Sequence, residues 1–154
     1  MKTNRGYLVI YLLVPVFLLA QEHAILFRHI SLEDGLSQST ANCIVQDHKG
    51  FIWIGTEDGL NRYDGYTFKV YKPVLQDTTS ISNNSIWALH VDTDNMLWVG
   101  TFGGLNRFDP STERFKRYLH DPENPKSLSH NHVKVIYEDT KGVLWIGTNG
   151  GGLC

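Results

Sequence analysis

The sequence predicts an all-β fold built from repeated four-stranded units, and three observations support this prediction. The tetrapeptide Trp-Ile/Val-Gly-Thr occurs at Trp53–Thr56, Trp98–Thr101 and Trp145–Thr148. The tryptophans are 45 and 47 residues apart, a period typical of arrays of supersecondary units. Short runs rich in Val, Ile, Phe, Tyr and Trp surround each copy, and Gly, Asp, Asn, Pro and Ser separate these runs, as expected for strands joined by turns.

Each unit contains four predicted strands, here called a to d. Strand a ends before an Asp, strand b contains Trp-x-Gly-Thr, strand c reads Gly-Leu-Asn-Arg-Tyr/Phe-Asp, and strand d reads Phe-Lys-x-Tyr. Four antiparallel strands repeated at about 45 residues predict the blade of a β-propeller. A β-sandwich is the alternative, but a sandwich does not repeat one phrase at this period. We expect blade 1 at 40–72, blade 2 at 85–119, and blade 3 at 132–154 without strands c and d.

These blades do not close a ring, because about 2.5 blades are present and closed propellers typically have 4–8. We therefore expect the rest of the same polypeptide to supply the remaining blades, with a non-functional truncated remnant as the alternative. Residues 24–30 contain Phe-Arg-His-Ile, which is similar to a strand d but precedes the first strand a. This order predicts a ring-closing strand that is an unpaired edge in this chain.

Residues 1–20 have the pattern of a secretory signal peptide. Lys2 and Arg5 precede an apolar run from Tyr7 to Ala20. This run is shorter than the roughly 20 residues that span a bilayer, and it ends on a small residue suited to cleavage. We predict export, with residues 21–154 as the mature propeller segment; an uncleaved membrane anchor is the alternative.

Charge and cysteine content exclude several classes of function. The net charge is −2 and the charged residues are mixed, so no basic stripe indicates nucleic-acid binding. Cys43 and Cys154 are far apart, which supports neither a disulfide nor a metal site. His130 and His132 share a loop but lack a third ligand. We predict no catalytic residues, no metal and no cofactor.

Features that recur in every unit are interpreted as structural. The tryptophans are expected to form the core between blades, and the glycines after them to allow close backbone approach or an unusual φ. These expected core positions are Trp53, Trp98, Trp145, Gly55, Gly100 and Gly147.

Ligand recognition is instead expected where the copies differ. The b–c loops lie on one rim of a propeller, and they begin with Glu57, Phe102 and Asn149. Strand a is innermost, and its divergent positions include Asn42, Trp87 and Lys134, so that some of these face the central channel. Aromatic rings can stack on the C–H faces of sugars. The candidate ligand site is Trp87, Phe102, Glu57 and Asn149.

The repeats resemble those of the two-component regulator propeller family, whose typical phrase is D-x-x-G-x-L/I-W-I-G-T-x-x-G-L-x-R-F/Y-D. The segments Gly50–Lys72 and Asn95–Tyr118 carry this phrase, and Phe27–Asp47 is similar to the usual start of such arrays. The resemblance implies the periplasmic sensor region of a hybrid two-component histidine kinase, a class found largely in Bacteroidetes.

The resemblance also implies partners and location. Many family members sense oligosaccharides, and the complete proteins add an Ig-like domain, a membrane helix, a kinase, a receiver and a DNA-binding domain. We therefore expect an oligosaccharide ligand, a homodimer, and a location on the periplasmic side of the inner membrane. This chain itself would not be an enzyme. A secreted propeller lyase or hydrolase and a protein-docking propeller are the alternatives.

Overall fold

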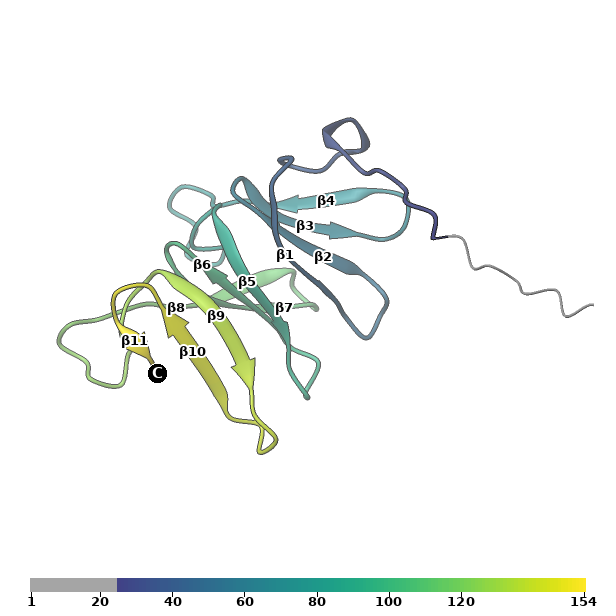
Figure 1. Cartoon of the computed structure of the whole chain (residues 1–154). Helices are drawn as coiled ribbons and strands as arrows, with labels where there is room; N and C mark the ends of the chain where they lie inside the picture. Colours follow the sequence, from purple (N-terminus) through teal and green to yellow (C-terminus); the bar gives the residue numbers. More distant parts are fainter. Residues whose placement is uncertain (1–24) are drawn as a thin grey trace, which may run out of the picture.

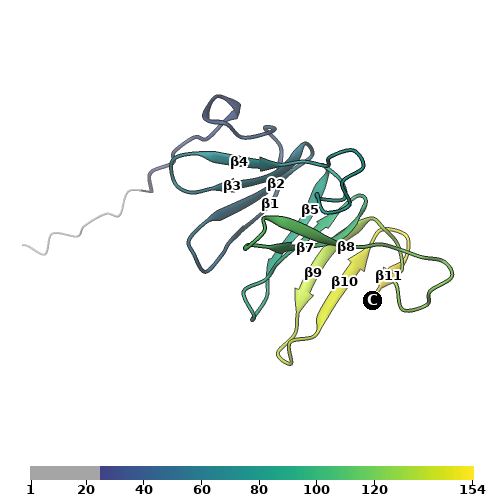
Figure 2. The same ribbon diagram turned by 180° about the vertical axis from the view of Figure 1, so that it is seen from behind.

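The computed structural model describes residues 25–154, so the predicted signal peptide at 1–20 lies outside the described residues. Three antiparallel β-sheets stand side by side like the open segments of a fan (Figure 1). The view from behind shows the same order of sheets (Figure 2). This arrangement confirms the predicted all-β, partial-propeller fold.

The three sheets are three successive blades. Blade 1 consists of β1 (Ala41–Gln46), β2 (Ile52–Thr56), β3 (Gly59–Tyr63) and β4 (Phe68–Tyr71); blade 2 of β5 (Ile86–Val91), β6 (Leu97–Thr101), β7 (Gly104–Asp109) and β8 (Arg114–Tyr118); and blade 3 of β9 (Val133–Glu138), β10 (Leu144–Thr148) and β11 (Gly152–Leu153). Neighbouring strands of each sheet follow chain order. Blade 3 was expected to lack strand c, but β11 is the beginning of that strand and pairs with β10.

The innermost strands are the first strands of each blade. β1 contacts β5, and β5 contacts β9, while β4 and β8 lie at the far edges of their sheets (Figure 1). Strand a of each blade therefore faces the centre of the fan, as in a propeller.

The aspartate that begins the a–b turn of every blade accepts hydrogen bonds from both the turn and the repeated tryptophan. One carboxylate oxygen of each Asp accepts backbone N–H groups of its turn. The other oxygen accepts the indole N–H six residues later: Asp47–Trp53 at 2.8 Å, Asp92–Trp98 at 2.6 Å and Asp139–Trp145 at 3.1 Å. This double role gives a physical reason for the fixed spacing between the two residues.

The burial of the repeated tryptophan depends on the blade that packs on it. Trp53 is only 1% exposed, and its ring packs at 5.0 Å from the ring of Phe108 in blade 2. Trp98 is half-buried, and Trp145 is 42% exposed. The expected core position is thus filled between blades 1 and 2, whereas within residues 25–154 nothing follows blade 3 to cover Trp145.

The glycines after the tryptophans permit close packing of neighbouring blades. A Cβ at Gly55 would lie 2.6 Å from Cγ2 of Ile86 in blade 2, and a Cβ at Gly100 would lie 2.7 Å from Cγ1 of Val133 in blade 3. At Gly147 the nearest atom would belong to the same sheet, at 3.2 Å. A side chain at the first two positions would force the blades apart.

The segment before blade 1 forms no strand. Residues 25–30 have no regular structure, and Phe27 is 94% exposed, so the ring-closing pairing is not formed here. A short 3-10 turn, η1 (Leu32–Asp34), follows, capped by Ser31. Within residues 25–154, no helix has the length and apolar character needed to cross a bilayer.

Candidate functional site

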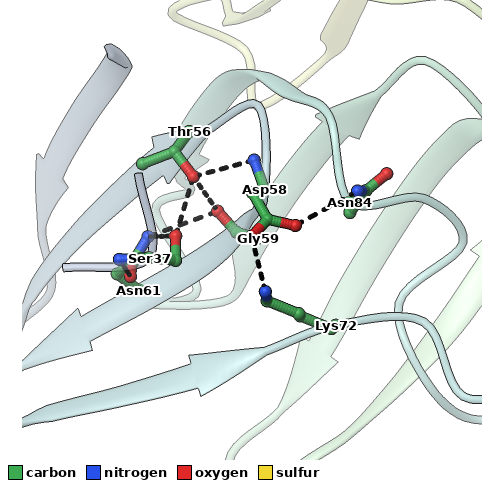
Figure 3. A network of polar contacts seen from close by, with 7 residues as sticks. All are labelled: Ser37, Thr56, Asp58, Gly59, Asn61, Lys72 and Asn84. Carbon is green, nitrogen blue, oxygen red and sulfur yellow. Dashed lines mark hydrogen bonds and ion pairs between the residues drawn. The ribbon is translucent and has the colours of Figure 1, made fainter. Parts of the chain in front are cut away.

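A buried polar network fixes the rim that carries the b–c turns. In blade 1 the Asn61 side chain accepts the backbone N–H of Ser37 at 2.9 Å and donates to the Ser37 hydroxyl at 2.9 Å (Figure 3). The Thr56 hydroxyl bonds Ser37 at 2.8 Å and donates to the carbonyl of Gly59 at 3.0 Å. Asn61 and Thr56 are fully buried, so the turn between β2 and β3 is tied to the loop before β1.

The same network recurs in the other blades. Ser82, Thr101 and Asn106 make the equivalent bonds in blade 2, at 2.9 Å for each of the three bonds that join Ser82 to Thr101 and Asn106. In blade 3, Ser129 bonds Thr148, and Cys154 occupies the position of the asparagine, with Sγ 3.6 Å from the carbonyl oxygen of Ile146. The rim is therefore a rigid frame, on which the residues that differ between blades are presented.

The innermost strand of each blade carries a bulge near this rim. The pairing register shifts around Asn42 in β1, Trp87 in β5 and Lys134 in β9. A bulged residue has no direct cross-strand partner. Its side chain therefore departs from the regular alternation of side chains between the two faces of the sheet. Asn42, Trp87 and Lys134, which diverge in sequence at equivalent positions, are thus the three bulge positions.

A group of five side chains, here called the His132 cluster, forms between blades 2 and 3. It contains Trp87, Phe102, His132, Lys134 and Asn149. The His132 ring lies 4.5 Å from the ring of Phe102 and 5.9 Å from that of Trp87, measured between centroids. Asn149 Nδ2 lies 3.3 Å from His132 Nδ1, and the Lys134 ammonium lies 3.1 Å from the centre of the Trp87 ring.

The cluster includes three of the four side chains predicted for a ligand site. Phe102 is 56% exposed, Asn149 is exposed, and Trp87 is half-buried. The fourth, Glu57, is exposed on the β2–β3 turn of blade 1, outside these contacts. The structure therefore joins the blade 2 and blade 3 positions and leaves Glu57 apart.

His132 is at the centre of the cluster and is only 7% exposed. Burial lowers the pKa of its ring from the ordinary value, and the nearby Lys134 and His130 lower it further. The ring is therefore neutral near pH 7. An amide nitrogen can only donate, so Nδ1 accepts from Asn149 and the proton of the neutral ring resides on Nε2.

Two polar atoms in the cluster are buried without hydrogen-bond partners, Nε1 of Trp87 and Nε2 of His132. Buried polar groups are nearly always paired, because an unpaired donor costs about 1–3 kcal/mol. Unpaired atoms of this kind are therefore uncommon in a purely structural core, which makes the cluster the candidate functional site.

Sequence reasoning missed the role of His132, which it considered only as half of a weak metal pair. In the structure His130 Nδ1 accepts the backbone N–H of His132 at 3.1 Å, and residues 25–154 contain no group of three His, Cys, Asp or Glu side chains arranged for a metal. Aligning the units shows a usable signal: the residue before strand a is Thr40 in blade 1, Ser85 in blade 2 and His132 in blade 3.

A separate groove of about 420 Å³ opens at the outer side of blades 2 and 3. Its apolar lining repeats the core between blades 1 and 2, position by position. Trp98, Leu105, Tyr118, Leu128, Leu144 and Ile146 correspond to Trp53, Leu60, Tyr71, Ile81, Leu97 and Val99. The first interface also contains the rings of Phe108 and Phe115 from strands c and d of the following blade.

Antiparallel sheets of up to four strands, stacked by their innermost strands and repeating one Asp–Trp contact, define a β-propeller repeat protein. The family described as two component regulator propeller matches at residues 35–58, 80–103 and 127–150. The chain belongs to this family through these three repeats.

Similar proteins of known structure are sensor ectodomains. The chain is 31% identical to the extracellular domain of the hybrid two-component system BT3049 from B. thetaiotaomicron, with a TM-score of 0.74 over 82% of this chain and 19% of that one. It is 33% identical to the extracellular domain of the hybrid two-component system BT4673 from the same organism, with a TM-score of 0.61 over 73% of this chain and 16% of that one.

A sequence relative agrees with this grouping. Histidine kinase P4 of Formosa agariphila is 43% identical over 74 residues, which are 48% of this chain and 5% of that protein. Virginiamycin B lyase of Staphylococcus aureus shares the fold, at 16% identity and a TM-score of 0.51. The chain thus spans less than a fifth of the length of the sensor kinases and ectodomains that it matches.

Proposed function

We propose that this chain is the N-terminal part of the ligand-sensing propeller of a hybrid two-component histidine kinase, and that the His132 cluster recognises an oligosaccharide. The observation that carries the proposal is the composition of the cluster. The hydrogen-bonded frame of the rim is repeated in every blade, whereas the side chains of the cluster differ between blades. They include the exposed ring of Phe102, the exposed amide of Asn149, and the unpaired donors of Trp87 and His132.

The chemistry of the cluster suits a sugar. Phe102 is 56% exposed although it contacts His132, so part of its ring is accessible for stacking. Asn149 offers an amide to hydroxyl groups, and it is held by a bond from its backbone N–H to the carbonyl of His132 at 2.8 Å. An apolar ring beside a few placed polar groups is the usual composition of a small-molecule site.

The groove between blades 2 and 3 supports the idea of a longer propeller. Since it reproduces the lining of the first interface without the two phenyl rings, we propose that it receives aromatic residues from strands c and d of a completed third blade. The sensor would be exported to the periplasm, anchored in the membrane through later parts of the polypeptide, and dimeric. Ligand binding at the rim would then change the packing of the propellers and thereby the activity of the kinase.

The proposal is tested with the complete protein that carries this chain. A panel of neutral and acidic oligosaccharides is screened by calorimetry, and kinase autophosphorylation is measured with each binder. Replacement of Phe102 or Trp87 by Ala should weaken binding by about tenfold or more, a loss of about 1.4 kcal/mol. The matched control is Tyr66→Ala, which removes a 91%-exposed ring from the β3–β4 turn at the opposite end of the blade.

Two results would decide against the proposal. One is unchanged affinity in folded Phe102 and Trp87 variants, which would exclude the cluster as the binding site. The other is binding without any change in autophosphorylation, which would favour a docking or storage role over sensing.

A further inference from the structure

The His132 cluster contains several hydrogen-bond donors that have no acceptor within residues 25–154. Nε1 of Trp87 and Nε2 of His132 are buried donors without partners. Lys134 adds a full positive charge: the ion pairs formed within residues 25–154 join other side chains, and the recorded contact of its ammonium group is with the Trp87 ring.

The contact with the Trp87 ring leaves the ammonium group able to bind a ligand. A cation over an aromatic face is attracted to the ring, but the ring offers no lone pair that accepts a hydrogen bond from the ammonium group. The three N–H groups of Lys134 therefore still require acceptors, and within residues 25–154 its ammonium charge has no carboxylate counterpart.

We infer that the His132 cluster binds an anionic group of its ligand, a carboxylate or a sulfate, through Lys134 together with the Trp87 and His132 N–H groups. The inference deepens the proposed function, on which it rests, by naming acidic saccharides as the class of ligand. An anionic oxygen is the acceptor that makes the strongest bonds to an ammonium group, and its several lone pairs can accept from more than one donor.

Charge is the reason to prefer an acidic ligand to a neutral one. A hydroxyl group could accept from either ring donor, but it leaves the Lys134 charge uncompensated. Neutral His132 contributes a donor without a second positive charge, since burial and Lys134 keep its ring unprotonated. The cluster thus carries one cation, which matches a single acidic group.

Trp87 provides the readout. The indole N–H groups of Trp53, Trp98 and Trp145 donate to aspartates, whereas that of Trp87 is unpaired, so its nitrogen–proton NMR signal should be distinct. The full chain is titrated with sodium acetate in one arm and sodium sulfate in the other, with sodium chloride at matched ionic strength as the reference. The first arm detects carboxylate binding and the second detects sulfate binding.

We expect at least one of the two anions to shift the Trp87 indole signal saturably, with a Kd of about 1–10 mM, as for one small charged group. Lys134→Gln should weaken this binding by about tenfold or more, and Lys134→Arg should retain most of it. Lys141→Gln is the matched control, because it removes the same charge from the exposed β9–β10 turn at the opposite end of the blade.

Two outcomes would overturn the inference. One is that neither anion shifts the Trp87 signal more than chloride does, or that the Lys134→Gln variant binds the anions as tightly as the original chain. The other is that a neutral oligosaccharide shifts the Trp87 and Phe102 signals with an affinity that Lys134→Gln leaves unchanged. This second result would remove the acidic ligand class but leave the sensor proposal intact, so the two failures are distinguishable.

Discussion

At the scale of single residues, one repeated side chain has three different environments. Trp53, Trp98 and Trp145 bond equivalent aspartates, yet the first is buried, the second half-buried and the third 42% exposed. The difference arises from the neighbouring blade, because the rings that pack on Trp53 belong partly to blade 2. Burial at this position is therefore a measure of how complete the next blade is.

The first prediction concerns these tryptophans. Trp53→Ala should destabilise the chain by about 3–5 kcal/mol, since it removes a buried ring that packs on Phe108. Trp145→Ala is the control, with a clearly smaller expected cost because 42% of its surface is exposed. Urea unfolding followed by circular dichroism measures both. Equal losses would contradict the idea that the following blade supplies the burial.

The second prediction concerns the protonation of His132. Burial, together with Lys134 and His130, lowers its pKa in the folded state, while the unfolded ring titrates at the ordinary value of about 6.5. As pH falls below that value, the unfolded chain takes up a proton before the folded chain does, so the folded state loses stability. His132→Asn, which keeps an acceptor near Nδ1, should reduce this loss.

The measurement is urea unfolding of the original chain and of His132→Asn at several pH values between about 5 and 7, a window that lies above the ordinary pKa of carboxyl groups. The free energy of unfolding should decrease more steeply toward low pH in the original chain. Identical slopes would mean that the His132 ring is not held neutral by its surroundings.

At the scale of strands, the glycine next to the last residue of strand b sets the distance between blades. Gly55 lies against Ile86 of blade 2 and Gly100 against Val133 of blade 3. Both neighbours are β-branched residues at the beginning of the next strand a. The small residue and the branched residue are thus complementary parts of one contact, repeated from blade to blade.

The third prediction follows from this contact. Gly55→Ala would place its Cβ 2.5 Å from Cys43 Sγ and 2.6 Å from Ile86 Cγ2, so overpacking should cost about 1–3 kcal/mol. Gly147→Ala is the matched control, because its nearest contact is 3.2 Å and it lies within the same sheet. Thermal unfolding compares the two variants, and a Gly55→Ala variant as stable as the control would show that the blades separate freely.

The sequence predicted the strands well because each strand is specified locally. The Asp that begins each a–b turn, the Gly-Thr that ends strand b and the alternation between them recur in all three units. The start of strand c in blade 3 was missed because β11 has only two residues, Gly152 and Leu153, with an added glycine before them.

The candidate site was predicted only in part, since its centre depends on contacts between blades. Comparing copies identified Trp87, Phe102 and Asn149, because those positions differ within a repeated frame. The position of His132 between the two aromatic rings depends on the stacking of blade 3 against blade 2. Glu57 satisfied the same sequence criterion, but it lies on the β2–β3 turn of blade 1, outside the contacts of the His132 cluster.

At the scale of the whole molecule, the two interfaces between blades are unequal. The first contains the rings of Trp53, Tyr71, Phe108 and Phe115, with centroids 5.0–5.8 Å apart. The second has the equivalent lining from blade 2 but a groove of about 420 Å³ where the two phenyl rings would lie. Apolar burial is the main stabilising contribution to such an interface, at roughly 25 cal/mol per Å², so blade 3 should be held less firmly.

The fourth prediction is a gradient of hydrogen exchange along the chain. Amides of β2, β3 and β6 should open only with global unfolding, whereas those of β10 and β11 should open with much smaller free energies, because local stability follows buried apolar contacts. Exchange followed by mass spectrometry or NMR on the full chain measures this gradient. Equal protection in all three blades would contradict the inequality of the interfaces.

The same measurement tests whether the groove is a docking surface for later strands. In the longer protein proposed above, aromatic residues filling the groove would bury Trp98 and Tyr118, as Phe108 and Phe115 bury their counterparts in the first interface. Protection of β10 should then rise toward that of β6, while β2 stays unchanged because its environment is already complete. An equal rise in all blades would indicate general stabilisation of the protein. No rise in β10 would mean that the groove stays open in the longer protein and that later strands do not stabilise the third blade.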